Sequence, residues 1–359
     1  MLAGMRAPAW LRVVLGIGLL LGCRPRSAPA LDEPVSSRIE ERGVSVLDPE
    51  GHLLVRSATT QAGQASYAVR DVASGELLGE FTGHAESKRY TRSLALTRTA
   101  SLVASLRGRG DEILVWDLRT RELVSRIRTD AWVVGYAFDR DERSLMIATE
   151  RGLERRALPD GRIVAAWPIV GVRAFAAVPG RAAWILAVQR RSKEKWARAI
   201  VAEFLLLDER RPRPRRLRIP EVFGVVGLRI SPDGRMLAVA AWGLDAHHLQ
   251  VWNLRTRRRI LVNDWGHVNA MEFSADSRTL VASLGFRCTH DARVTAWNLG
   301  TARPAFEFRA AQASSIRIVG DEARVVIGDD VLGVDLATGR TRDIYKTPCE
   351  GICNVMLCG

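Results

Sequence analysis

The chain has 359 residues, of which 47% are hydrophobic, and it carries a formal net charge of +13 at pH 7. This length is sufficient for one large domain with a full core. Helical periodicity is absent after residue 30. That absence excludes a helical domain. We therefore predict no second domain and expect nearly all strand and loop.

Residues 1–22 have the features of a signal peptide. Arg6 and Arg12 give a positively charged start, and the apolar run at 13–22 is too short to span a bilayer. The run ends in Leu-Leu-Gly directly before Cys23. This ending resembles the lipobox of bacterial lipoproteins, in which the cysteine thiol takes a diacylglycerol. The resemblance implies that Cys23 is lipidated and anchors the chain to a membrane.

The residues after the apolar run bear on the destination of the protein. Residues 23–42 contain proline, serine and glutamate, as expected of a flexible tether. The lipobox implies a bacterial envelope protein facing the periplasm, and Arg24 in place of aspartate favours the outer membrane. Cleavage at Ala30, after an A-x-A site, is the alternative. It would give a soluble secreted or periplasmic protein.

A short phrase containing Trp-Asp or Trp-Asn recurs along the chain, at residues 115–120, 251–256, 296–301 and, weakly, 333–339. Asn253 and Asn298 are about 45 residues apart, and a fixed period of that size indicates a repeat architecture. Two degenerate copies, at residues 154–161 and 204–208, fill the gap between the first and second clear copies. With one more copy near Asp71, the count is seven units.

Each unit has the same internal order. In the sixth unit an alternating apolar segment at 268–273 is followed by a turn, an apolar run at 279–284, the Trp-Asn segment and a shorter segment at 305–308. Alternation bounded by turn residues indicates strands joined by hairpins. One four-stranded sheet cannot bury both faces, whereas seven sheets around an axis can. We therefore predict an all-β, seven-bladed β-propeller of four-stranded antiparallel sheets over residues 43–346.

At this point the residues resemble the WD40-repeat family. The Gly-His element of that family matches at His84 and His267, and its tryptophan matches in three units, at Trp116, Trp252 and Trp297, with Asp117 as its aspartate. The resemblance implies a buried network of His267, Ser283, Asp291 and Trp297 in the sixth unit. Units 1, 3, 4 and 7 lack the tryptophan and most units lack Gly-His, so a different β-propeller family is the alternative.

Four cysteines remain if Cys23 is lipidated, namely Cys288 in a loop and Cys349, Cys353 and Cys358 in the tail at 347–359. Because an exported protein is in oxidising surroundings, we expect two disulfides, one of which involves Cys288. A four-cysteine zinc site is the alternative.

The positive charge is almost all arginine and is clustered in two adjacent units. One cluster falls between the third and fourth strands of unit 4, at Arg210, Arg211, Arg213, Arg215 and Arg216, and the other at the same place in unit 5, at Arg257, Arg258 and Arg259. Such a patch suits phosphate or carboxylate groups of an anionic envelope component. Nucleic acid is a poor candidate for an exported protein. The alternative is a solvated face in a chain that uses arginine throughout.

The opposite face carries aromatic residues in its loops, at Tyr90, Trp132, Trp196, Trp242, Trp265 and Phe286. Aromatic residues on a rigid rim are typical of protein-binding surfaces. The alternative is that about half of these rings pack between blades.

Signals for chemistry are weak. No G-x-S-x-G elbow, P-loop or H-E-x-x-H is present. Loops of units 5 and 6 hold polar residues that could converge on a metal, at Asp245, His247, His248, His290 and Asp291, but they have no known ligand spacing. We therefore expect no cofactor, no metal and no catalysis, and predict a protein-interaction scaffold. The alternative is an exported propeller enzyme or small-ligand binder that uses the central channel.

Overall fold

The computed structural model describes residues 44–59, 65–83, 91–108, 110–191, 200–211, 213–220, 222–241, 249–286 and 292–346, which all belong to one compact unit. The predicted signal peptide, tether and tail lie outside these ranges. So do the following predicted site residues: Cys23, His84, Trp196, Trp242, Cys288, Asp291, Cys349, Cys353 and Cys358. The metal candidates Asp245, His247, His248 and His290 also lie outside them.

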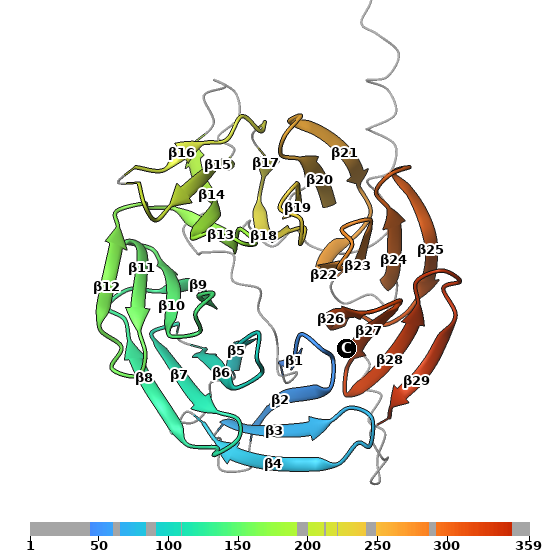
Figure 1. Ribbon diagram of the computed structural model, residues 1–359, viewed down its shortest axis with the longest axis horizontal. Coiled ribbons are helices and arrows are strands. Elements are labelled where there is room, and N and C mark those ends of the chain that lie inside the picture. The colour runs from blue at the N-terminus through green and yellow to red at the C-terminus, as the bar shows by residue number, and fades with distance from the viewer. Residues whose placement is uncertain are drawn as a thin grey trace, which may run out of the picture. The chain divides into compact units, whose positions relative to one another are not determined.

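The described residues form seven antiparallel sheets around a common axis, which confirms the predicted seven-bladed propeller (Figure 1). In each sheet the strands follow chain order from the axis outwards, and the first strand is the innermost. None of the described segments is a helix long and apolar enough to cross a membrane.

The first four blades are built from consecutive strands. Blade 1 contains β1 (Ser45–Leu47), β2 (Leu53–Thr59), β3 (Ala65–Asp71) and β4 (Leu77–Thr82). Blade 2 contains β5 (Thr91–Leu96), β6 (Leu102–Arg107), β7 (Glu112–Asp117) and β8 (Leu123–Arg128). Blade 3 contains β9 (Val133–Phe138), β10 (Ser144–Thr149), β11 (Gly152–Ala157) and β12 (Ile163–Trp167). Blade 4 contains β13 (Val172–Ala177), β14 (Ala183–Arg191), β15 (Ile200–Asp208), β16 (Arg215–Arg216) and β17 (Val222–Phe223).

The last three blades are regular. Blade 5 contains β18 (Val225–Ile230), β19 (Met236–Ala241), β20 (Leu249–Asn253) and β21 (Arg258–Asn263). Blade 6 contains β22 (His267–Phe273), β23 (Thr279–Gly285), β24 (Ala292–Asn298) and β25 (Arg303–Arg309). Blade 7 contains β26 (Ala313–Val319), β27 (Glu322–Ile327), β28 (Asp330–Asp335) and β29 (Thr341–Tyr345).

The ring closes between blades 1 and 7, and among the described residues no strand from one end of the chain completes a sheet at the other. Instead the two blades pack side by side. Leu47 N donates to Ser315 Oγ at 3.4 Å, and Arg317 Nε donates to the Leu47 carbonyl at 3.3 Å. Arg56 pairs with Asp329 at 2.5 Å. The closure is therefore made of side-chain packing and polar contacts between whole blades.

The tryptophans of the repeat hold neighbouring blades together, as predicted. Trp116 is 3% exposed and packs on the preceding blade, with its ring 5.0 Å from Tyr67 and 5.2 Å from Phe81. Trp252 and Trp297 lie likewise in the cores between blades 4 and 5 and between blades 5 and 6. Burial of large aromatic side chains is a major source of stability in a core of this kind.

The residue after each tryptophan has a different task. Asp117 Oδ1 accepts hydrogen bonds from the backbone N–H groups of Arg119 and Thr120, both at 2.8 Å. Asn253, Asn298 and Asp335 make the same pair of bonds in their own blades. The aspartate or asparagine of the repeat therefore caps the turn between the third and fourth strands, because its short side chain can reach the N–H groups two and three residues ahead.

This cap makes the stability sensitive to acid. The backbone N–H of Thr120 holds the pKa of Asp117 below its usual value. A folded pKa below the unfolded value, about 3.9, means that the stabilisation is complete above that value and is lost as the pH falls through the folded pKa. We expect Asp117→Asn to keep the cap and to flatten the fall in melting temperature below about pH 4, measured by thermal denaturation. Asn253→Asp should steepen it, and equal pH profiles for the two variants would contradict this account.

Blade 4 departs from the pattern. Its outer strand is broken into β16 and β17, both of which pair with β15. Between them Ile219 turns inwards and is buried with Val222 in the core between blades 4 and 5. Arg215 and Arg216 therefore lie in β16, and Arg258 and Arg259 lie in β21. The prediction that all four lie in the connections between strands was wrong. Turn chemistry alone did not show where these outer strands begin.

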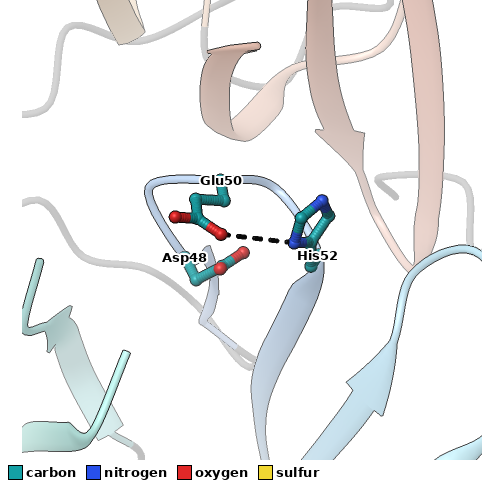
Figure 2. A group of neighbouring side chains, drawn as sticks. All are labelled: Asp48, Glu50 and His52. Atoms are coloured by element: carbon teal, nitrogen blue, oxygen red, sulfur yellow. Dashed lines mark ion pairs between the residues drawn. The ribbon is translucent and has the colours of Figure 1, made fainter. Parts of the chain in front are cut away.

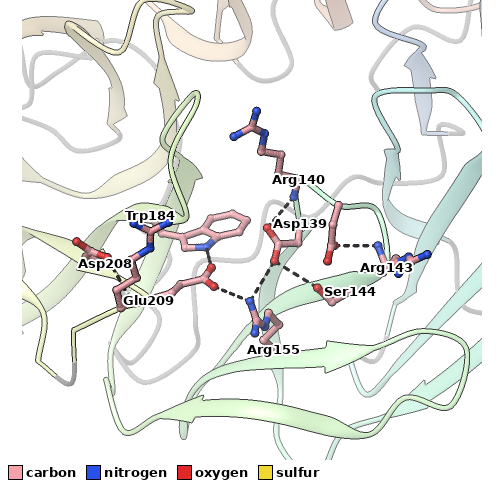
Figure 3. Close-up of polar contacts among 10 residues, drawn as sticks. Asp139, Arg140, Arg143, Ser144, Arg155, Trp184, Asp208 and Glu209 are labelled. Carbon is pink, nitrogen blue, oxygen red and sulfur yellow. Dashed lines mark hydrogen bonds and ion pairs between the residues drawn. The ribbon is translucent and has the colours of Figure 1, made fainter.

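The interface between blades 3 and 4 is filled from an unexpected strand. Leu207 occupies the position in β15 that tryptophan holds in other blades, and Trp184 in β14 pairs directly opposite it. Trp184 is 1% exposed, and its Nε1 donates to Glu209 Oε1 at 2.9 Å. Arg155 of blade 3 then donates to Glu209 Oε2 at 2.5 Å and to Asp139 Oδ2 at 3.4 Å (Figure 3). The indole is thus present at this interface, supplied by the second strand.

Candidate functional site

One position near the end of the innermost strands carries a charged side chain in three adjacent blades. It is the penultimate residue of six inner strands and the third from last of β26, and its occupants in blade order are Val46, Ala95, Ala137, Ala176, Arg229, Glu272 and Arg317. In blade 5 the flanking Leu228 and Ile230 pack into the core between blades 4 and 5. Arg229 therefore points to the other side of β18, where the charges of Glu272 in blade 6 and Arg317 in blade 7 act on it, because neighbours on a strand point to opposite sides.

The charged residues at this position belong to blades 5, 6 and 7. Arg317 pairs with Glu272 at 2.7 Å. Arg229 is exposed, and it donates to the Leu228 carbonyl at 3.3 Å. Desolvation lowers the pKa of Arg229, while the charge of Glu272 acts in the opposite direction. Glu272 is the single carboxylate of the described inner strands.

The two described tryptophans of the predicted protein-binding rim are both half-buried. Trp132 lies under the guanidinium of Arg92, 4.8 Å from the ring centre. Trp265 lies under Arg293 at 4.1 Å and meets the edge of Phe286 at 5.4 Å. Both are therefore covered on one face by an arginine, a cation–π arrangement that fixes the ring.

The same face exposes apolar side chains that the sequence analysis missed. Val170 is 63% exposed, Phe223 43% and Val226 48%. Val170 precedes β13, Phe223 lies in β17, and Val226 lies in β18, so all three sit where the chain passes from one blade to the next. The inner strands β13 and β18 are neighbours in the ring. We call Val170, Phe223 and Val226 the apolar patch.

The predicted arginine clusters are exposed on the outer part of blades 4 and 5. Arg211 pairs with Asp208 at 3.6 Å and Arg216 with Glu203 at 3.4 Å, while Arg259 lies 5.8 Å from the Trp252 ring. Within the part of the chain that the structure describes, no ion pair involves the remaining members, Arg210, Arg213, Arg215, Arg257 and Arg258. Their charges are therefore available to an anionic partner.

A second group of titratable residues lies in the turn between β1 and β2 (Figure 2). Asp48, Glu50 and His52 bring their ligand atoms within 4.8 Å of one another. Asp48 Oδ1 already accepts a hydrogen bond from Leu53 N at 2.8 Å, and Glu50 pairs with His52 at 3.5 Å. Glu50 and His52 are exposed. The group is explained by the turn that it closes.

The predicted buried network of blade 6 is described in part. Ser283 Oγ accepts a hydrogen bond from Ala313 N at 3.0 Å, which ties blade 6 to blade 7. The His267 ring meets the edge of Phe286 at 5.7 Å. Trp297 is buried against blade 5. Each of these side chains contributes to packing within or between blades.

Comparison with known proteins supports the fold. No protein-family profile matches the sequence, and no curated protein matches it. The chain is similar in structure to the β-propeller domain of Cps50 (Swd1) from Myceliophteria thermophila, with 14% identity, a TM-score of 0.60 and coverage of 86% of this chain and 98% of that one. It is also similar to hydrazine synthase from Kuenenia stuttgartiensis, with 13% identity, a TM-score of 0.62 and coverage of 87% and 100%. The chain is thus a seven-bladed β-propeller, and its likeness to these two structures concerns the fold alone.

Proposed function

We propose that this protein is a non-catalytic scaffold that binds a partner protein through the face carrying the apolar patch. The observation that carries the proposal is the exposure of Val170, Phe223 and Val226 at the junctions of adjacent blades. Exposed apolar side chains on a rigid surface lose water on binding without a large cost in ordering. The arginine-covered Trp132 and Trp265 lie in blade-to-blade connections of the same kind.

The proposed cellular location of the scaffold is based on the sequence of residues 1–23. We propose that Cys23 carries a lipid that tethers the propeller in the bacterial envelope, facing the periplasm. The exposed arginines of blades 4 and 5 would then favour an anionic envelope component, because guanidinium groups bind phosphate and carboxylate in a bidentate manner. Binding of this kind weakens as salt is added.

A paired substitution tests the proposed surface. We expect the double variant Val170→Glu and Phe223→Glu to lose a partner that the wild-type chain retains from solubilised membranes, since two buried, unpaired carboxylates at an interface are costly. The control is Leu123→Glu with Ile163→Glu, which adds the same charge at residues that are exposed to a similar extent on the outer strands of blades 2 and 3.

The result is read by quantitative mass spectrometry of the retained proteins. Loss in the patch variant with retention in the control supports the proposal. Equal retention of the partner by both variants, or its loss only in the control, would show that the binding surface lies outside the apolar patch. Unchanged melting temperatures of both variants exclude unfolding as the cause.

A further inference from the structure

The exposed arginines of blades 4 and 5 share one stretch of surface. β16 and β21 lie on the outer side of these adjacent blades (Figure 1). Leu217, which follows β16, and Leu254, which follows β20, pack against the same core between the two blades. Their exposed neighbours Arg218 and Arg255 therefore lie at the surface of the same interface. Two blades thus contribute cations to one surface.

The arginines of blade 4 are positioned by the segment that carries them. Leu217 and Ile219 belong to the core, whereas Arg216 and Arg218 are exposed. Alternate residues of an extended segment point the same way and lie about 7 Å apart. Arg216 pairs with Glu203 at 3.4 Å, but Arg218 has no ion pair among the described residues. A free cation is therefore held beside a neutralised one.

Arg257 of blade 5 occupies a position that suits glycine better. It has φ +61° in the turn between the third and fourth strands, where its N–H donates to the Asn253 carbonyl at 2.7 Å. The equivalent residue of the described turns is glycine in blades 1, 3 and 7, arginine in blade 2 and alanine in blade 6, namely Gly75, Gly161, Gly339, Arg121 and Ala302. A left-handed conformation costs an L-residue stability that glycine retains.

A contact accounts for the arginine of blade 2 but not for that of blade 5. Arg121 donates from its guanidinium to the Leu78 carbonyl of blade 1. The exposed side chain of Arg257 makes no hydrogen bond, ion pair or ring contact with a described residue. Strained residues of this kind cluster at functional sites. The free positive charge is what Arg257 adds to the surface.

We propose that Arg218, Arg257 and Arg258 dock this surface on an anionic lipid bilayer, through the phosphate groups of its lipids. The three arginines lie along a strand and a turn, so that an extended plane of phosphates meets them better than one small anion does. The inference rests on the proposed lipid anchor at Cys23, which would keep a bilayer at hand. Residues 24–43 can span about 70 Å when extended, enough for blades 4 and 5 to face that bilayer.

Co-sedimentation with vesicles tests the docking. The seven blades form one compact unit within residues 44–346, so the probe protein is the chain from residue 24 on, which lacks the anchor. We expect it to bind vesicles that contain phosphatidylglycerol but not vesicles of phosphatidylcholine alone, and to bind less as salt is added. An arginine variant with Arg218→Gln, Arg257→Gly and Arg258→Gln should bind about 100-fold more weakly, at about fivefold for each arginine near an anionic surface.

The matched control removes the same charge from blades 2 and 3. It carries Arg98→Gln, Arg119→Gln and Arg140→Gln, at exposed residues that form no ion pair among the described residues. This control should keep most of the wild-type affinity. An equal loss in the two triple variants would show that net charge alone drives binding and would overturn the proposal, as would an absent preference of the wild-type chain for phosphatidylglycerol.

Arg257→Gly alone separates binding from structure. It should weaken vesicle binding about fivefold without lowering the melting temperature, because glycine removes the strain. Arg257→Lys keeps the charge and should bind as the wild-type chain does. A lower melting temperature for Arg257→Gly would show that the arginine stabilises its turn and would contradict its role in docking.

The docking and the scaffold proposal can fail separately. The Val170→Glu and Phe223→Glu variant should bind anionic vesicles as the wild-type chain does. If the arginine variant lost an acidic protein from solubilised membranes while its vesicle binding was unchanged, the arginines would belong to a protein interface and docking on lipid would be wrong.

Discussion

Replacing Trp184 by alanine should lower the free energy of unfolding by about 3–5 kcal/mol, which is the usual cost of removing a buried tryptophan. The indole is 1% exposed between blades 3 and 4 and also donates to Glu209. We expect the cost to equal that of Trp116→Ala, because both rings fill an interface between blades although they come from different strands. Urea denaturation of the purified protein measures both.

The control for this prediction is Trp132→Ala. Trp132 is half-buried and lies in a connection between blades, so its removal should cost less than the removal of either core ring. A Trp184→Ala variant as stable as Trp132→Ala would show that Leu207 and its neighbours hold the interface without the indole. Trp184→Phe should fall between wild type and alanine, since it keeps an aromatic ring but leaves Glu209 without the indole N–H.

Gly266→Ala is expected to destabilise the propeller by about 3 kcal/mol, from two additive causes. Gly266 has φ +68°, a conformation that costs an L-residue about 1–2 kcal/mol. A Cβ there would also lie 2.8 Å from the backbone nitrogen of Gly285 in the neighbouring strand. Backbone cannot move aside as a flexible side chain can, and overpacking of this kind adds about 1–3 kcal/mol.

Gly234→Ala separates the two causes. Gly234 has nearly the same φ, +71°, but nothing lies within 4 Å of the position of its Cβ. Its substitution should therefore show the conformational cost alone. Denaturation midpoints and slopes of the two variants measure the difference. If both variants lost the same stability, the close approach to Gly285 would play no part.

Gly266 belongs to the Gly-His element that resembles the WD40 pattern. Gly83 holds the same position in the other copy of this element, but for a different reason. Gly83 has no positive φ, and a Cβ there would overlap the ring of Tyr67. Two blades thus retain the same motif residue for two physical reasons. The sequence pattern could identify the position, but only coordinates separate a backbone requirement from a packing requirement.

The blade count and strand order were predictable because tryptophan and the turn-capping aspartate or asparagine recur at a fixed spacing. The role of Trp184 at the interface between blades 3 and 4 was not predicted. The sequence of β14 alone does not show that its tryptophan lies opposite Leu207 and fills the space that the third-strand tryptophan fills in other blades. The shared charged position of blades 5 to 7 could have been found by aligning the seven inner strands on the turns that follow them. Such an alignment places Arg229, Glu272 and Arg317 at one level.

The apolar patch and the outer strands were harder to predict. Six inner strands carry a β-bulge near their first residues, which shifts the pairing by one residue. A bulge redirects the side chains around it: Val226, the extra residue of β18, is exposed, while Val225 beside it is buried. The bulge has no clear signature in the residue types at these positions.

Because every blade is one continuous stretch of chain, the seven junctions between blades are equivalent in topology, except that no described segment connects blade 7 to blade 1. Its first strand, β1, has three residues, each paired once with β2. Tension applied to the chain ahead of residue 44 would load this short strand in a peeling direction, one residue pair at a time. A propeller held from that end would therefore lose β1 first, and with it the contacts of Leu47 to blade 7, before the other six interfaces open.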